Sequence, residues 1–199
     1  MNLITAVQVD LGFMVDGSQN VLETDFKQYT DIVKYICSAF PISSEDVHVG
    51  LGIISSNPEI IFSFDKYFDK QILNMTVSSV EYPGPLQEFN VGQALAVAKE
   101  TLFSKSARKG VRQVLVLLVS GKSRDDFSDD IRQLRDSGVE IFCFGVGNRV
   151  DVIELAEMAT TPPNKHIVLD SVYNLPRGAR KLVEKLQIAK VEYGKVIVV

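Results

Sequence analysis

The stretch LGFMVDGSQN, residues 11–20, decides the fold of this chain. Its first five residues are apolar, as in a buried strand, and its last five are the small and polar residues of a turn. An amphipathic segment opens soon afterwards, near Thr24. A strand therefore ends in a polar loop that leads into a helix, and open α/β sheets bind ligands at that edge.

The alternation of apolar runs with helical stripes continues to the far end of the chain. We predict strands at residues 11–15, 47–54, 59–62, 114–119, 141–146 and 166–169, and helices at about 24–40, 69–80, 91–102, 125–137, 152–158 and 175–186. The turn at Asn57-Pro58 is so short that the 59–62 strand must run antiparallel to the strand before it. The pattern predicts a three-layer, doubly wound, Rossmann-like α/β fold, with a mostly parallel six-stranded sheet and one antiparallel edge strand. The strand that ends at Asp16 should lie beside the highly apolar 114–119 strand at the centre of the sheet.

Composition and charge are typical of one globular domain. The chain has 199 residues, of which 46% are hydrophobic, and a net charge of −4. This charge indicates no basic surface for nucleic acid or an anionic membrane, and no apolar run reaches the roughly 20 residues of a membrane span. The N-terminus has no secretion signal, so we interpret the chain as one domain excised from a longer protein. Cys37 and Cys143 lie in apolar stripes, which predicts two buried, unbridged thiols.

Five short motifs, in order and at consistent spacing, resemble those of von Willebrand factor A domains. They are FMVDGS (13–18), VGL (49–51), NVGQAL (90–95), VLLVSGKSRDD (116–126) and FGVGN (144–148). The last two are most similar to the N-terminal A domains of collagen VI alpha chains, the alpha-3 chain in particular. The resemblance implies an A domain over residues 9–189, an N-terminal extension at 1–8 and a C-terminal tail at 190–199. The tail, which ends in the β-prone run VIVV, is an additional edge strand or a linker.

In this family the turn after the first strand supplies ligands to a divalent cation, at a metal-ion-dependent adhesion site. Asp16 and Ser18 match the first two ligands, and Asn20 replaces the third, a serine. The family's second-loop threonine falls on Phe89, and its strand-end aspartate falls on Ser120. The resemblance therefore implies a degenerate site without metal, because a hard cation requires several oxygen ligands and compensating negative charge.

A second alignment keeps a metal site as an alternative. Counted with one additional residue in the second loop, Glu88 takes the place of Phe89 and restores a carboxylate. Together with Asp16 and its loop, Glu88 would hold Mg²⁺ in a metal-dependent adhesion domain. Lys122 closely follows the fourth predicted strand and places a positive charge near this position, which disfavours a cation there.

A small α/β enzyme with an unrecognised site is the other alternative. GKS at 121–123 follows a strand, as a phosphate-binding loop does, but that motif requires glycine at the position of Val116. His48 and His166 are the only histidines, one inside a strand and one at a strand start, and Ser18 has no evident base. We interpret the acidic residues at 125–130 as the exposed start of a helix. We therefore predict neither catalytic residues nor a cofactor.

The sequon Asn74-Met75-Thr76 is a candidate N-glycosylation site. Together with the resemblance, it implies a secreted glycoprotein of the extracellular matrix. The function we expect is non-enzymatic: assembly or adhesion through contacts with matrix proteins or neighbouring A domains, without nucleic acid and without membrane insertion.

Overall fold

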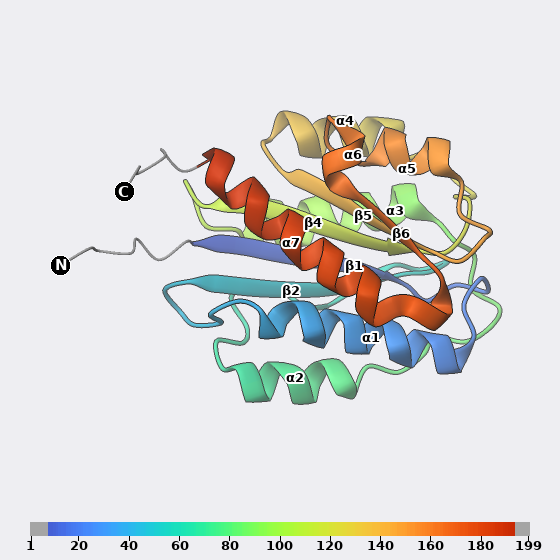
Figure 1. Cartoon of the computed structure of the whole chain (residues 1–199), viewed down its shortest axis with the longest axis horizontal. Helices are drawn as coiled ribbons and strands as arrows, with labels where there is room; N and C mark the ends of the chain where they lie inside the picture. The colour runs from blue at the N-terminus through green and yellow to red at the C-terminus, as the bar shows by residue number, and fades with distance from the viewer. Residues whose placement is uncertain (1–7, 194–199) are drawn as a thin grey trace.

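Six strands form a single sheet in the computed structural model, which describes residues 8–193 (Figure 1). They are β1 (Val9–Asp16), β2 (Val47–Ile54), β3 (Glu59–Phe62), β4 (Arg112–Val119), β5 (Glu140–Val146) and β6 (Ile167–Asp170). The order across the sheet is β3-β2-β1-β4-β5-β6, and of the described strands β3 alone is antiparallel to its neighbour. This confirms the predicted fold, including the central pairing of β1 with β4.

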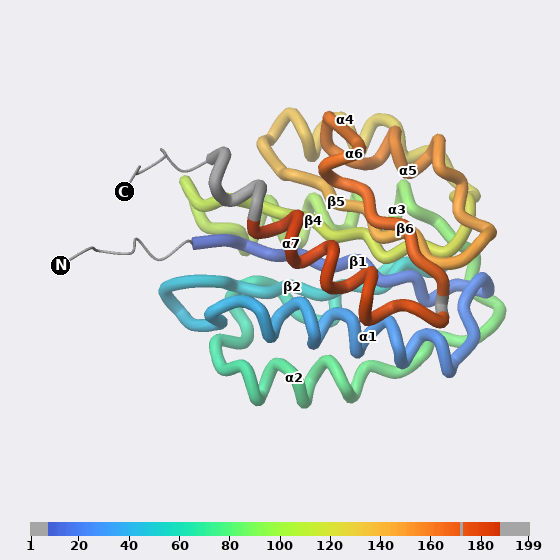
Figure 2. Tube along the Cα trace, in the orientation of Figure 1, coloured from blue at the N-terminus to red at the C-terminus, as the bar shows by residue number. Residues whose placement is uncertain are grey.

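Helices cover both faces of the sheet, as the tube in Figure 2 also shows. One face carries α1 (Glu23–Ser38) and α7 (Leu175–Tyr193), with α2 (Lys70–Ser78) packed against α1. The other face carries α3 (Val91–Ala98), its π-helical continuation η1 (Lys99–Ser106), α4 (Ser128–Asp136) and α5 (Val152–Met158). Two short elements, α6 (Pro163–His166) and the 3-10 turn η2 (Val172–Asn174), flank β6. None of the helices in the described range has both the length and the apolarity that a membrane crossing requires.

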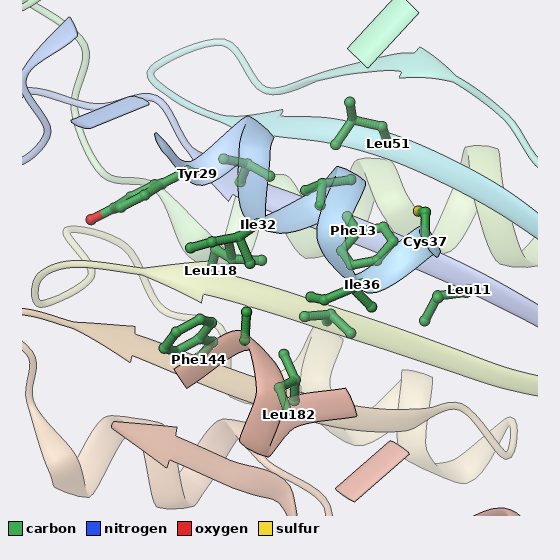
Figure 3. Close-up of a cluster of buried hydrophobic side chains, with 14 of the residues drawn as sticks. Leu11, Phe13, Tyr29, Ile32, Ile36, Cys37, Leu51, Leu118, Phe144 and Leu182 are labelled. Atoms are coloured by element: carbon green, nitrogen blue, oxygen red, sulfur yellow. The ribbon is translucent and has the colours of Figure 1, made fainter. Parts of the chain in front are cut away.

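β4 shows how the sheet is buried on both faces. Its side chains alternate between two hydrophobic clusters, with Val116 and Leu118 in the first and Leu117 and Val119 in the second. Figure 3 shows the first cluster, where side chains from the sheet meet those of α1 and α7. This period of two follows from the pleat of a strand that is covered on both sides.

The two cysteines are buried and unbridged, as predicted. Cys37 belongs to the first cluster and Cys143 to the second. Burial raises the pKa of the Cys37 thiol to about 12, and it raises the pKa of the Cys143 thiol as well. Both side chains are therefore protonated at neutral pH and serve as small hydrophobic residues.

Two helices have ends that differ from the prediction because of local hydrogen bonds. α1 covers residues 23–38 instead of 24–40, because the Ala39 N–H already turns back to the Ile36 carbonyl (3.0 Å). α4 begins at Ser128 instead of residue 125, because the Asp126 carboxylate accepts a hydrogen bond from the Ser128 N–H (2.9 Å). Asp126 therefore fixes the turn that precedes this helix.

The helix predicted at 91–102 changes its winding after Ala98. The hydroxyl of Ser104 donates to the Lys99 carbonyl (2.8 Å), and that of Ser106 donates to the Thr101 carbonyl (3.3 Å). The backbone over Lys99–Ser106 is wound as the π-helix η1, and these side-chain hydrogen bonds accompany that winding. The sequence periodicity identified the helix but not this change in winding.

The C-terminal part differs from the prediction at two boundaries. β6 begins at Ile167, because His166 closes the short helix α6. α7 runs to Tyr193, beyond the end of the helix predicted at residue 186. The edge strand or linker expected at the end of the tail lies outside the described residues.

Candidate functional site

Asp16, the last residue of β1, is the centre of the candidate site, and it is fully buried. Its Oδ1 accepts a hydrogen bond from the Ser18 N–H (2.9 Å). Its Oδ2 accepts one from the Ser120 N–H (3.2 Å) and another from the Ser120 hydroxyl. Because β1 and β4 are parallel neighbours, their carboxyl ends bring these residues together. Both oxygens of the carboxylate are thus occupied by donors from the protein.

The loop after Asp16 is held by its own hydrogen bonds. Ser18 is buried, and its Oγ accepts a hydrogen bond from the Asn20 N–H (3.2 Å). The Tyr82 hydroxyl reaches the carbonyls of Ser18 (3.3 Å) and Val21 (2.9 Å) from a distant part of the chain. Serine oxygens that bond to their own loop are typical of a structural turn.

Asn20 lies against the loop that follows β4. A Cβ added at Gly121 would be 2.4 Å from the Asn20 Nδ2, so the Asn20 side-chain amide packs directly against this glycine. The structure therefore brings together four of the residues singled out in the sequence, namely Asp16, Ser18, Asn20 and Ser120.

Phe89 and Glu88 do not join this group. The Phe89 ring is buried in the second hydrophobic cluster, and its carbonyl accepts a hydrogen bond from the Arg124 N–H (2.9 Å). Glu88 is exposed, and its N–H donates to the Ser56 Oγ (2.7 Å). Within the described part of the chain, neither side chain forms a hydrogen bond to Asp16 or its loop.

Lys122 extends toward the start of α5. Its ammonium nitrogen is 3.6 Å from the Asp151 carboxylate and 3.9 Å from that of Glu154. The lysine side chain is 69% exposed, so water screens these pairs. The positive charge predicted to lie near the candidate site is thus directed at two other acids.

Asp125 has a role that the sequence reasoning missed. Its Oδ1 accepts a hydrogen bond from the Gly92 N–H (2.9 Å) and its Oδ2 accepts one from the Gln93 N–H (2.8 Å), so it caps the first turn of α3. The Ser123 hydroxyl supports it with a bond to Oδ1 (2.8 Å). The expectation that residue 125 belongs to the exposed start of a helix is therefore wrong. No local sequence pattern links the two segments, and their close approach is seen only in the structure, where a Cβ on Gly92 would lie 2.1 Å from the Asp126 carbonyl oxygen.

The electrostatics of the site are set by the burial of Asp16. Burial raises the pKa of its carboxyl group, and the hydrogen bonds from Ser120 and Ser18 offset this only in part. Burial, with the negative charge of Asp16 added, also raises the pKa values of the Tyr29 and Tyr82 hydroxyls. No lysine or arginine of the described chain forms an ion pair with Asp16. It is a buried carboxyl group without a counter-charge from the protein.

These residues do not fit a divalent cation as they are arranged. Within residues 8–193, no three acidic, histidine or cysteine side chains are grouped closely enough to hold a metal ion. Asp16 is the single carboxylate of the group, and a hard cation needs several oxygen ligands with free lone pairs. The Ser120 hydroxyl, where the family has an aspartate, donates to Asp16 and adds no charge.

The histidines lie at the other edge of the sheet. His48 pairs with Asp10, six residues before Asp16 on β1, which corresponds to about 20 Å along the strand. His166 is hydrogen-bonded to the Glu140 carboxylate (2.9 Å). Neither histidine can therefore act as a base for a serine beside Asp16 in this arrangement.

Comparison with known proteins agrees with the observed fold. The model of the von Willebrand factor type A domain matches residues 10–184. The chain belongs to this family. The match covers every described strand except the first residue of β1, and it includes both loops that meet at Asp16.

Similar A domains occur in proteins of the extracellular matrix. The chain is 34% identical to von Willebrand factor A domain-containing protein 1 of Rattus norvegicus, over 89% of this chain and 43% of that protein. It is 30% identical to Matrilin-1 of Gallus gallus, over 79% of this chain and 32% of that protein. Among solved structures, proximal thread matrix protein 1 from the mussel byssus matches with a TM-score of 0.84 and 18% identity, over 91% of this chain and 48% of that one. The chain thus spans less than half the length of these proteins.

Proposed function

We propose that this A domain is a non-enzymatic interaction module of the extracellular matrix, which acts in assembly or adhesion through protein contacts that need no bound metal ion. The observation that carries the proposal is the closure of Asp16 by Ser18 and Ser120, which use both of its carboxylate oxygens. The matrix setting of the relatives supports the class of partner, namely matrix proteins or neighbouring A domains. The motifs at 116–126 and 144–148 support a parent similar to collagen VI alpha chains.

The alternative is a metal-dependent adhesion domain. One similar structure is that of the mussel thread protein with a zinc-occupied MIDAS motif, at a TM-score of 0.82 and 19% identity. For this chain, such a site would rest on Asp16, Ser18, Asn20 and Glu88. Among the described residues the exposed Glu88 side chain forms no hydrogen bond to the Asp16 loop, although the adjacent Gln87 carbonyl accepts one from the Gln19 N–H (2.8 Å). Ser120 uses its hydroxyl to close the carboxylate, and this supports the metal-free proposal.

A cation titration of the folded domain tests the proposal. A working site with a Kd of about 0.1 mM would stabilise the domain by about 2 kcal/mol at about 5 mM Mg²⁺, which is a rise of a few degrees in Tm. We expect no rise with Mg²⁺, Mn²⁺ or Zn²⁺, and no fall with a chelator. A Mg²⁺-dependent rise for the unmodified domain would contradict the proposal, and Glu88→Gln would then identify the missing ligand.

A double substitution that should create a metal site tests the same proposal. The double change Phe89→Thr with Ser120→Asp restores the hydroxyl and the carboxylate of the family pattern, and we expect it to create a Mg²⁺-dependent rise in Tm. The matched control is Phe89→Thr with Ser120→Asn, which has nearly the same shape without the charge. If Mg²⁺ raises the Tm of both double variants equally, the missing carboxylate is not the reason that the natural site binds no metal.

We also propose that the parent protein is secreted and that Asn74 is its candidate glycosylation site. The residue lies on α2, a helix that packs against α1 (Figure 1), and it is partly exposed. A loss of mass on enzymatic deglycosylation, absent from Asn74→Gln, is the measurement that checks it.

A further inference from the structure

A groove of about 840 Å³ lies between α1 and α2, far along the chain from the loops that meet at Asp16. Lys34 of α1 lines it, together with Lys70, Asn74 and Ser78 of α2. The three α2 residues are spaced by four, so they form a continuous row along one side of that helix. The volume lies within the range of pockets that hold a small organic group.

Met75 gives this groove an exposed apolar rim. Its side chain is 66% exposed, and Ile72, which is adjacent to it on the helix surface, is 52% exposed. Met75 is the single exposed methionine within residues 8–193, since Met14 and Met158 are buried. The groove therefore carries apolar surface that nothing in the described chain covers.

The amide of Asn74 is oriented by the burial of its oxygen. Its Oδ1 is buried and has no hydrogen-bond partner. Its Nδ2 forms no hydrogen bond with any described residue and is not among the buried atoms, so the nitrogen is the end of the amide that reaches solvent. Asn74 opens the sequon that Met75 and Thr76 complete. The atom that carries an N-linked glycan is thus the accessible one, and it lies in the wall of the groove.

Two lysines supply the groove with hydrogen-bond donors. The Lys34 ammonium group donates to the Ser78 hydroxyl (2.9 Å) and pairs with Asp31 (2.7 Å). The Lys70 ammonium group donates to the Ser38 carbonyl (3.1 Å). An ammonium group has three N–H donors, so each lysine keeps at least one that these partners do not use. Donors beside an apolar side chain are complementary to a sugar ring, which has C–H groups on its faces and oxygens on its rim.

We propose that the first N-acetylglucosamine of a glycan on Asn74 occupies this groove. Attachment forms a bond between Nδ2 and C1 of the sugar, while the nitrogen loses one proton and the bond from C1 to a lipid diphosphate donor breaks. The sugar ring covers Met75, and its oxygens accept hydrogen bonds from Lys34 and Lys70. The inference rests on the proposed glycosylation of Asn74 and adds where the sugar lies and what it covers.

The glycan decides which faces of the domain are open to partners. An N-linked glycan is bulky and solvated, so it separates the exposed apolar surface of α2 from other chains. The contacts with matrix proteins or neighbouring A domains are therefore made by other faces of the domain.

The oxidation of Met75 measures whether the sugar covers it. The chain is secreted from cells that attach N-glycans and is divided into three samples: intact, trimmed by an endoglycosidase to a single N-acetylglucosamine, and freed of glycan by peptide N-glycanase. Each sample is treated with hydrogen peroxide, and the formation of sulfoxide at each methionine is followed by peptide mass spectrometry. We expect Met75 to oxidise severalfold more slowly in the intact and trimmed samples than in the glycan-free one. The buried Met14 and Met158 should remain unoxidised in all three.

Two double variants locate the effect. Asn74→Gln with Ser104→Asn moves the sequon to η1 on the other face of the sheet, where Ser106 completes it. In that glycosylated variant, Met75 should oxidise as fast as in the glycan-free sample. Lys34→Gln with Lys70→Gln keeps the sequon and should raise the rate toward the glycan-free value, because the sugar loses its charged donors.

Equal rates with and without the glycan would overturn the inference but not the glycosylation of Asn74, which the mass of the secreted chain shows independently. A secreted chain without a glycan at Asn74 would overturn both. Slow oxidation with the relocated sequon would show that the groove is not the cause of the protection, and this too would overturn the inference. The three samples of the unmodified sequence decide the matter even if a variant fails to fold. The cation titration tests the metal-free proposal separately.

Discussion

The two edges of the sheet bury carboxylates in opposite ways. At the amino edge, Glu140 is paired with Arg112 at 2.6 Å, and Asp10 is paired with Arg108 at 2.8 Å. At the carboxyl edge, Asp16 is just as deeply buried, yet its donors are N–H and hydroxyl groups only. One edge is closed by opposite charges and the other by neutral hydrogen bonds.

The consequence is visible in the direction of two pKa shifts. Burial acts to raise the pKa of Glu140, but the hydrogen bond from His166 and the charge of Arg112 outweigh it, so the pKa is lowered. Burial also acts on Asp16, where no cation opposes it, and the pKa is raised. The comparison teaches that depth of burial alone does not decide the state of an acid in this fold, because the counter-charge does.

The largest expected effect on stability comes from removing the buried ion pair between Arg112 and Glu140 at the amino edge. Arg112→Met leaves the Glu140 carboxylate buried without its cation and also removes a hydrogen bond to the Leu186 carbonyl (3.1 Å). We expect the free energy of unfolding, measured by urea denaturation, to fall by about 3–5 kcal/mol. Arg132→Met is the control, because Arg132 and Asp129 form an exposed pair, and it should have no measurable effect. Similar losses in both variants would show that burial of the pair is not the cause.

A smaller expected effect is on the pH dependence of stability, to which Asp16 and Glu140 should contribute with opposite signs. The native pKa of Asp16 lies above its unfolded value, so the native state binds more protons, and the stability contributed by Asp16 falls as pH rises above about 4. The native pKa of Glu140 lies below its unfolded value, so its contribution is present above about 4.5 and is lost as pH falls through the native pKa.

Stability curves over pH check this prediction. The difference between the unmodified domain and Asp16→Asn should decrease with rising pH, and the difference from Glu140→Gln should increase. Neither slope can exceed about 1.4 kcal/mol per pH unit for a single group. Slopes of the same sign for the two variants would show that the edges do not differ in the way described.

The smallest expected effect is the loss of stability when the cation nearest the carboxyl edge, Lys122, is removed. Lys122→Met removes an exposed cation whose nearest acids are Asp151 and Glu154, so we expect a loss of at most about 0.5 kcal/mol. The pH dependence assigned to Asp16 should stay the same in this variant. A shift of that dependence would mean that Lys122 does supply charge to the buried carboxyl group.

Much of the fold could be predicted from the sequence, because the strands are apolar runs and the helices are periodic stripes. The pairing of β1 with β4 followed from the rule for doubly wound sheets, and it placed Asp16 and Ser120 at one edge. That the Ser120 hydroxyl donates to the Asp16 carboxylate could not be predicted, since it depends on the distance between two strand ends. The two residues are 104 positions apart in the sequence.

Contacts between loops could not be predicted from the sequence. Asp125 caps α3 from a loop 33 residues beyond Gly92, and no local pattern contains both residues. Hydrophobic periodicity does not distinguish Leu169, which is 46% exposed, from Val168, which is buried beside it.

The described chain enters along β1 and leaves along α7 on the same side of the domain (Figure 1). The hydrogen bond from Arg112, the first residue of β4, to the Leu186 carbonyl places this part of α7 at the amino edge of the sheet. Mechanical tension carried by a longer polypeptide would therefore pull at two points of one edge. The Asp16 loop lies at the far end of β1 from both points, so such a load would enter the domain away from that loop.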